Sequence, residues 1–313
     1  VTLEALHYPL GGWDAWSCWN LKAKFIYLGH ENWTDMLDPV LWRSNTQYPL
    51  LLPCINVFFW DIQGYAAWVP MLNSILFMLC SAGILLFGLY EISKQWLLPI
   101  ALTAACFLIP FNITLGISQY SDILLGLFLI AAFICFLNEE LMACALFIGL
   151  LSFTKTEGTV AALLLSGGLC LFHLKSIKQW GPYLLGAGLP TIIFTFFMAP
   201  HNEAFINGLT SSLKPSTLER LQITLVLWFY ELISPKWHGI WILLLAGVAV
   251  CWKKAFEGRM LLFALFIAGY LGIVLMYYEV NTFFEISWWV TNTLNRIIFA
   301  LLPSALLWLG LAL

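Results

Sequence analysis

The stretch that decides the fold of this chain is its last one, which carries no charged residue and follows directly on Arg296: Ile297-Ile298-Phe299-Ala300-Leu301-Leu302-Pro303-Ser304-Ala305-Leu306-Leu307-Trp308-Leu309-Gly310-Leu311-Ala312-Leu313. A helix needs about 20 apolar residues to cross the hydrocarbon core of a bilayer. Stretches of the same character recur from Ala66 onward, separated by short polar segments. We therefore expect an all-α, polytopic transmembrane helical bundle.

The composition excludes a soluble globular protein. The 313 residues are 61% hydrophobic and only 10% charged, whereas about a quarter of the residues in a soluble domain are charged. The net charge is −3, and no run of Lys and Arg indicates a nucleic-acid partner. The length suits one helical membrane bundle, so residues 1–313 are expected to form a single domain.

Nine apolar stretches are candidate membrane spans, and polar residues separate each from the next. The chain begins at Val1 in a polar segment, without Met, so we expect up to one further span upstream. The nine candidates lie near residues 66–89, 96–115, 121–138, 141–154, 159–173, 182–199, 239–252, 260–277 and 297–313.

The distribution of Lys and Arg predicts the orientation. Short connections on one side of the predicted bundle collect the cations Lys94, Lys175, Lys178, Lys253, Lys254 and Arg259. Such an excess marks the cytoplasmic side. The other side has the long loops 1–65, 200–238 and 278–296, together with the tight turns Gln119–Asp122 and Lys155–Gly158. The outer loops also contain amphipathic segments expected to lie in the membrane interface, at Trp16–Tyr27, Pro49–Trp60 and around Leu218–Glu231.

Ionisable residues of both signs lie where the predicted spans meet the outer side: Asp14, Asp122, Lys155, Glu157 and Arg296. Each has a simpler explanation. A carboxylate near a helix start can act as an N-cap, and a long cation at a span end can reach toward the interface. Lys155 and Glu157 share one of these places, and the coincidence of opposite charges at four places on one side favours a cleft instead.

Short motifs in this outer region resemble those of the GT-C glycosyltransferases. The first loop contains Gly11-Gly12-Trp13-Asp14-Ala15, the pair Lys22-Ala23 and Gln47-Tyr48-Pro49-Leu50-Leu51-Leu52-Pro53. Later segments are Gln119-Tyr120-Ser121-Asp122, Thr154-Lys155-Thr156-Glu157-Gly158 and Asn295-Arg296 ahead of Pro303. Together these motifs resemble the corresponding segments of the dolichyl-phosphate-mannose protein mannosyltransferases and of the bacterial aminoarabinose and related lipopolysaccharide sugar transferases.

This resemblance implies transfer of a sugar from a polyprenyl-phosphate donor to a hydroxyl or amine of a lipid, glycan or protein acceptor. It places the active site on the extracytoplasmic face, most simply of a bacterial inner membrane. Asp14 would be the general base. Lys155 and Arg296 would bind the phosphate, with Asp122, Glu157 and Tyr48 completing the substrate site. The resemblance implies no metal or other cofactor.

Two other classes of protein stay open. A secondary transporter would place ionisable residues and broken helices near the bilayer midplane, where this chain is nearly free of charge. A non-catalytic membrane subunit would require Asp14 to be dispensable. A lipid-sugar ligase or polymerase is an enzyme of neighbouring type. Uptake of a solute into vesicles would separate the transporter from the enzymes.

Overall fold

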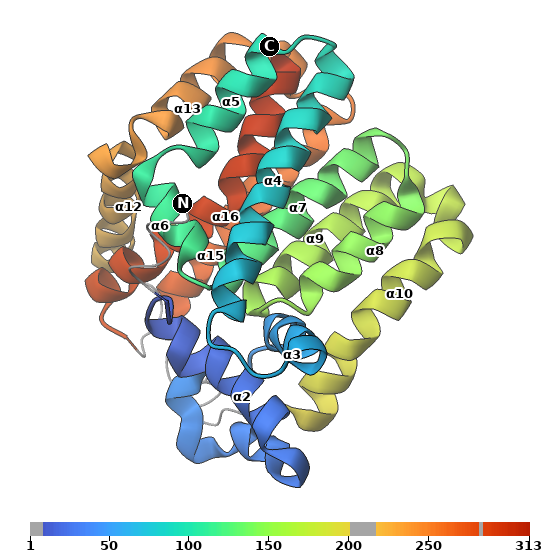
Figure 1. Cartoon of the computed structure of the whole chain (residues 1–313). Coiled ribbons are helices and arrows are strands. Elements are labelled where there is room, and N and C mark those ends of the chain that lie inside the picture. Colours follow the sequence, from blue (N-terminus) through green and yellow to red (C-terminus); the bar gives the residue numbers. More distant parts are fainter. Residues whose placement is uncertain (1–8, 201–216, 282–283) are drawn as a thin grey trace.

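The computed structural model describes residues 9–200, 217–281 and 284–313, which form helices and no strand. Parts of all three predicted outer loops therefore lie outside the described residues. The helices are α2 (Asn20–Leu28), α3 (Leu51–Gln63), α4 (Val69–Ser93), α5 (Leu97–Phe107), α6 (Pro110–Ile117), α7 (Ser121–Leu137), α8 (Leu141–Ser152), α9 (Thr156–His173), α10 (Ile177–Ile193), α12 (Leu218–Ile233), α13 (Ile240–Val250), α14 (Trp252–Ala255), α15 (Met260–Val280) and α16 (Ile286–Ala312) (Figure 1). Shorter π and 3-10 turns occur at Ala15–Trp19, His30–Leu37, Pro39–Ser44, Leu174–Ser176, Phe194–Met198 and Pro235–Trp237.

The predicted all-α, membrane-like character is confirmed in its general form. Among the described residues, 4 helical stretches are long and apolar enough to cross a membrane: Val69–Ser93, Thr156–Met198, Met260–Val280 and Ile286–Ala312. If the bent pair α5 and α6 counts as one span, the number of candidate spans among the described residues rises to 5. Three further predicted spans correspond to the shorter apolar helices α7, α8 and α13. Nine separate crossings stay a prediction.

The predicted span 96–115 is broken in the middle. Helices α5 and α6 meet at an angle of 67°, because Pro110 cannot continue a helix and forces Ile109 into an extended conformation. The side chain of Asn112 donates a hydrogen bond of 2.6 Å to the carbonyl of Cys106. This bond satisfies one of the backbone acceptors that the break leaves without a helical partner.

The segment predicted as two spans at 159–173 and 182–199 is almost continuously helical from Thr156 to Met198. His173 interrupts it with non-helical dihedral angles (φ −135°, ψ 30°). Helices α9 and α10, on either side of this interruption, both pack against α8. Residues 174–181, which separate the two predicted spans, form the turn Leu174–Ser176 and the start of α10. Helix α10 runs parallel to α8, because Gly149 lies beside Ala187 and Ser152 Oγ lies 2.7 Å from Thr191 Oγ1, so the two predicted spans remain two helices.

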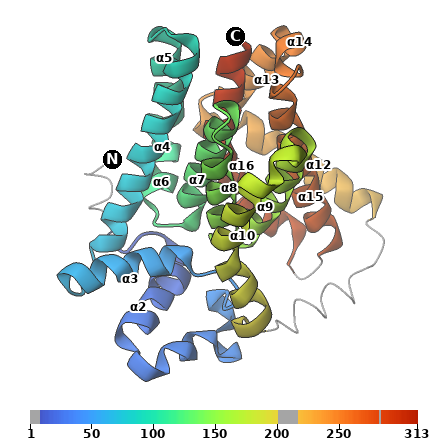
Figure 2. The ribbon, with the colours of Figure 1, turned by 90° about the vertical axis from the view of Figure 1, so that its right-hand side faces the viewer.

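The last helix differs most from the expectation. Helix α16 begins at Ile286, where the carboxylate of Glu285 accepts hydrogen bonds from the backbone N–H groups of Ser287 (2.9 Å) and Trp288 (2.7 Å). Arg296 therefore lies about three turns inside the helix, not at its mouth. Every residue from Ile297 to Gly310 is buried. Helices α4, α5, α7, α12 and α15 all contact α16, which runs through the middle of the bundle (Figures 1 and 2).

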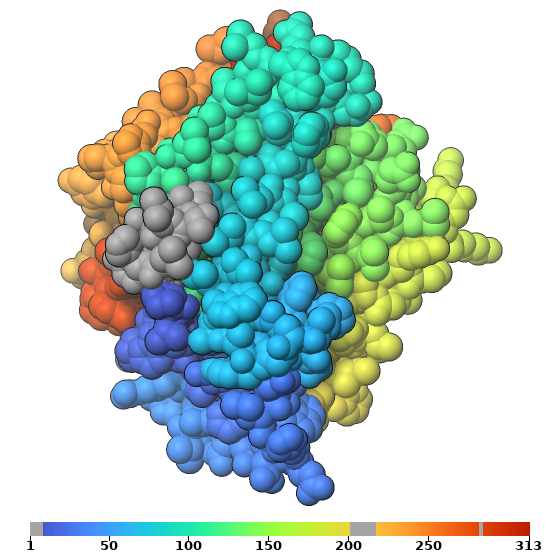
Figure 3. Space-filling model, viewed as in Figure 1, coloured from blue at the N-terminus to red at the C-terminus, as the bar shows by residue number. Residues whose placement is uncertain are grey.

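The two ends of the molecule are formed by different segments of the chain. Helices α2 and α3 lie at one end, while the turn from α4 to α5, helix α14 and the C-terminus lie at the other (Figures 1 and 2). In the space-filling view the first loop, coloured blue, forms the lower end (Figure 3). Lys94 is the C-cap residue of α4, directly after Ser93. Lys254 Nζ donates a hydrogen bond to the carbonyl of Leu313 at 3.4 Å. These predicted cytoplasmic cations thus lie at the end opposite to the first loop.

Candidate functional site

The candidate site is centred on the carboxylate of Asp122, in the first turn of α7. Its Oδ1 accepts a hydrogen bond from Lys155 Nζ at 2.8 Å. Its Oδ2 accepts from Arg296 Nη2 at 2.8 Å and from Arg296 Nε at 3.1 Å. The side chains of Asp122 and Lys155 are 3% and 5% exposed. Asp122 therefore holds two cations from distant parts of the chain, Lys155 buried and Arg296 partly exposed.

Two further carboxylates flank this buried centre. Asp14 Oδ2 lies 2.5 Å from Arg296 Nη1, and Glu157 Oε1 lies 3.2 Å from Lys155 Nζ. Both flanking carboxylates belong to side chains that are 27% exposed. The result is a row of alternating charges, Asp14, Arg296, Asp122, Lys155 and Glu157, in which three carboxylates face two cations.

This geometry differs from what the simpler explanations of Asp14, Asp122, Lys155 and Arg296 predict. Within the described residues neither Asp14 nor Asp122 caps a helix with its side chain. Arg296 does not reach out to an interface, because it pairs with two carboxylates and is only 17% exposed. Lys155 is buried. The structure thus brings together all five ionisable residues that the sequence singled out.

One backbone and one side-chain hydrogen bond dock the segment that carries Asp14 on the turn that carries Asp122. The N–H of Gly12 donates to the carbonyl of Ser118 at 3.0 Å, and Gln119 Nε2 donates to the carbonyl of Pro9 at 3.0 Å. The ring of Tyr120, next to Asp122, lies 4.2 Å from the guanidinium carbon of Arg296. This cation–π contact supports the guanidinium on a third side.

A second set of contacts positions the turn between α8 and α9. Ser121 Oγ donates to the carbonyl of Thr154 at 3.0 Å, which brings Lys155 next to Asp122. A side chain at Gly158 would collide with the carbonyl of Leu151 and with Thr154 Oγ1. Only glycine therefore allows the turn to close at this point.

Tyr48 lies beside this turn. Its ring stacks on Trp19 at 5.5 Å, and its carbonyl accepts from Lys22 Nζ at 3.1 Å. The nearby carboxylate of Glu157, together with burial, raises the pKa of Tyr48 well above its ordinary value. Tyr48 is therefore a neutral phenol at physiological pH, and it can donate a hydrogen bond to a ligand at the Glu157 end of the row.

A chain of buried carboxamides also supports the site, and sequence reasoning missed it. Asn73 donates to Asn56 (2.8 Å), Asn56 to Asn20 (3.2 Å) and Asn20 to Gln119 (2.8 Å). The chain joins α4, α3 and α2 to the turn before Asp122. Its sequence signal was present, because an Asn inside an apolar stretch needs a buried partner. The identity of that partner depends on the tertiary structure.

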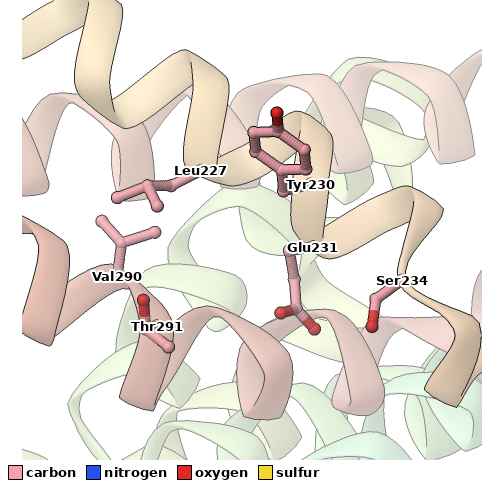
Figure 4. Close-up of a pocket in the computed structure, with 6 residues that line it drawn as sticks. All are labelled: Leu227, Tyr230, Glu231, Ser234, Val290 and Thr291. Atoms are coloured by element: carbon pink, nitrogen blue, oxygen red, sulfur yellow. The ribbon is translucent and has the colours of Figure 1, made fainter.

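A cavity of about 140 Å³ lies elsewhere, between α12 and α16, and none of the charged-row residues lines it (Figure 4). Its carboxylate, Glu231, already pairs with Lys236 and accepts from Trp237 Nε1. Among the described residues no group of three or more His, Cys, Asp or Glu could hold a metal ion.

Comparisons of this chain with protein families, with curated proteins and with solved structures found no match.

Replacement of Gly12 tests how the first segment docks. A side chain at Gly12 would overlap the hydroxyl of Tyr120, so Gly12→Ala has to push away the ring that supports Arg296. Overpacking of this kind costs about 1–3 kcal/mol. We expect a lower thermal unfolding temperature for Gly12→Ala. Gly83→Ala is the control for an added methyl without a collision, because nothing lies within 4 Å of its added Cβ; within α4 it should leave the unfolding temperature unchanged or slightly raised. Equal stability of the two variants would contradict the close contact.

Proposed function

We propose that this protein is an integral-membrane glycosyltransferase that moves a sugar from a polyprenyl-phosphate donor to an acceptor hydroxyl or amine. One observation carries the proposal: Arg296 and Lys155 lie side by side on one carboxylate, next to the more exposed carboxylates of Asp14 and Glu157. This set supplies both of the groups that the reaction requires, a cation pair for the departing phosphate and a base for the acceptor.

The chemistry follows from these groups. The acceptor oxygen or nitrogen forms a bond to the anomeric carbon while the bond from that carbon to the phosphate oxygen breaks. The electron pair leaves with the polyprenyl phosphate, where positively charged donors stabilise it. A guanidinium and an ammonium offer charge-assisted hydrogen bonds to phosphate oxygens. The acceptor proton goes to a carboxylate, which acts as general base.

We assign the base to Asp14 rather than Asp122. Asp122 accepts three hydrogen bonds and is 3% exposed, so its oxygens are occupied and an acceptor cannot reach them. Asp14 has one ion-pair contact and is 27% exposed. In this proposal Asp122 is a positioning residue for the two cations, and Glu157 and Tyr48 line the substrate site at the other end of the row.

The membrane arrangement is part of the same proposal. Nine crossings, with the helices at Ala15–Leu28, Leu51–Gln63 and Leu218–Ile233 lying in the interface, would leave the charged row on the extracytoplasmic side. The helices α7, α8 and α13 are shorter than a full span, so residues of the adjacent polar segments would complete each of these crossings. A bacterial inner membrane is the simplest location, because the resembled sugar transferases include bacterial ones.

The purified protein in liposomes tests the reaction directly. A mixture of lipid acceptors is supplied with polyprenyl-phosphate sugars or with the corresponding nucleotide sugars. Transfer from the lipid donor but not from the nucleotide donor is the expected result. Liposomes that take up a solute, and transfer no sugar from any lipid donor, would instead identify a transporter.

The orientation can be tested by labelling from outside intact cells. In a background without the eight native cysteines, we expect Asp61→Cys to react with a membrane-impermeant thiol reagent, because Asp61 is exposed in the first loop. Asn138→Cys and Lys253→Cys should react only after permeabilisation, although both positions are exposed in the structure. Labelling of Lys253→Cys in intact cells would reverse the orientation and the location of the site.

A further inference from the structure

We infer that Asp14 and Glu157 occupy the anion-binding positions of Arg296 and Lys155 in the free protein, and that the phosphate group of a prenyl phosphate, free or within the sugar-linked donor, displaces them when it binds. This inference rests on the proposed function and adds a coupling to it. In the free protein Asp14 is held in an ion pair, and the arrival of the donor releases it to act as a base.

The three carboxylates of the row are not equivalent. Asp122 is buried and accepts three hydrogen bonds from both cations. Asp14 has one contact, to Arg296 Nη1, and Glu157 has one contact, to Lys155 Nζ at 3.2 Å. The second oxygen of Glu157 is buried without a hydrogen-bond partner among the described residues. The two flanking carboxylates are therefore the ones that an incoming anion can replace.

The cations stay in place when their flanking partners leave. Asp122 holds Arg296 through Nε and Nη2, so that Nη1, now on Asp14, is the donor that becomes available. The ring of Tyr120 holds the guanidinium from another side. Lys155 keeps its 2.8 Å contact with Asp122 and has further N–H donors, since an ammonium group carries three.

Charge makes simple addition of a phosphate unfavourable. The row carries three negative and two positive charges, and a phosphate adds one or two more negative charges. If Asp14 and Glu157 stayed on the cations, the phosphate would compete with them for the same donors in a largely buried place, where like charges repel strongly. Exchange avoids this, because the displaced carboxylates turn toward solvent, where both side chains already have access.

The exchange predicts that removal of a flanking carboxylate tightens the binding of a phosphate. A protein whose binding-competent form is only partly populated binds its ligand with an affinity lowered by that fraction. Asp14→Asn and Glu157→Gln remove the competing charges, so each should tighten phosphate binding by about three- to tenfold. Simple loss of a substrate contact would weaken binding instead.

The test measures dissociation constants in nanodiscs for a C20 prenyl phosphate, for the matching prenyl alcohol and for inorganic phosphate. Asp61→Asn is the matched control, because it removes one exposed carboxylate from the same loop. We expect tighter binding of the prenyl phosphate by Asp14→Asn and Glu157→Gln, no change for Asp61→Asn, and weaker binding by Arg296→Ala and Arg296→Lys. The alcohol should bind all variants alike.

The outcomes separate the inference from the proposed function. If Arg296→Ala weakens binding while Asp14→Asn binds no more tightly than the parent protein, the exchange is wrong and the phosphate site stands. If both Arg296 variants bind the prenyl phosphate as tightly as the parent protein does, the phosphate site is elsewhere. The proposed mechanism and the exchange are then both wrong. Inorganic phosphate could also bind as tightly as the prenyl phosphate and show the same gain in affinity in Asp14→Asn and Glu157→Gln. That result would support the exchange but contradict the proposal that the donor is a lipid.

Discussion

Asp14→Asn is expected to lower the rate of sugar transfer by about 10²–10⁴-fold, which is the usual contribution of a general base. The carboxamide keeps the shape of the side chain and one hydrogen-bond acceptor for Arg296, but it cannot take the acceptor proton. The rate is measured with saturating donor in liposomes. Because the variant should bind the donor at least as well as the parent, the loss should lie in kcat and not in KM.

The folded state should survive this change. Asp14 is partly exposed and contacts the row through a single ion pair, and pairs of this kind contribute little to stability. The unfolding temperature of Asp14→Asn is therefore expected to be close to that of Asp61→Asn, the control with the same change of charge. Transfer at the parent rate by Asp14→Asn would end its assignment as the base.

Asp122→Asn should have the largest effect on stability. The substitution removes the charge that two cations share and turns an amide N–H toward their donors. Lys155, at 5% exposure, would keep only Glu157, and Arg296 would keep only Asp14. Breaking a buried ion pair from one side costs about 3–5 kcal/mol. We expect a clear fall in the unfolding temperature in detergent, measured beside the exposed control Asp61→Asn.

A double variant shows whether the cost comes from the unpaired charge. Lys155→Gln removes one of the stranded cations, so Asp122→Asn combined with Lys155→Gln should be more stable than the sum of the single effects predicts. Such coupling is expected for residues in direct contact. Strictly additive losses, or an unfolding temperature of Asp122→Asn equal to that of the control, would contradict the central role of Asp122.

The sequence by itself determined the class of structure and the candidate residues. In an apolar environment a single long apolar stretch can satisfy its own backbone hydrogen bonds only as a helix, so the length of these stretches indicated the all-α character. Pro110 marked the break between α5 and α6, although the expected span ran across it. The five ionisable residues of the row were recognisable because charges are rare in this chain and each lies beside an apolar stretch.

Only the tertiary structure decided which charges pair and which helix is central. Arg296 and Asp14 are separated by 282 positions in the sequence, and no local pattern encodes their contact. Hydropathy also could not show that the stretch after Arg296 is surrounded by other helices. Lipid tails and protein interiors are both apolar, so a lipid-facing helix and a central one have similar compositions. Packing, which hydropathy does not record, placed this helix inside and carried Arg296 to Asp122.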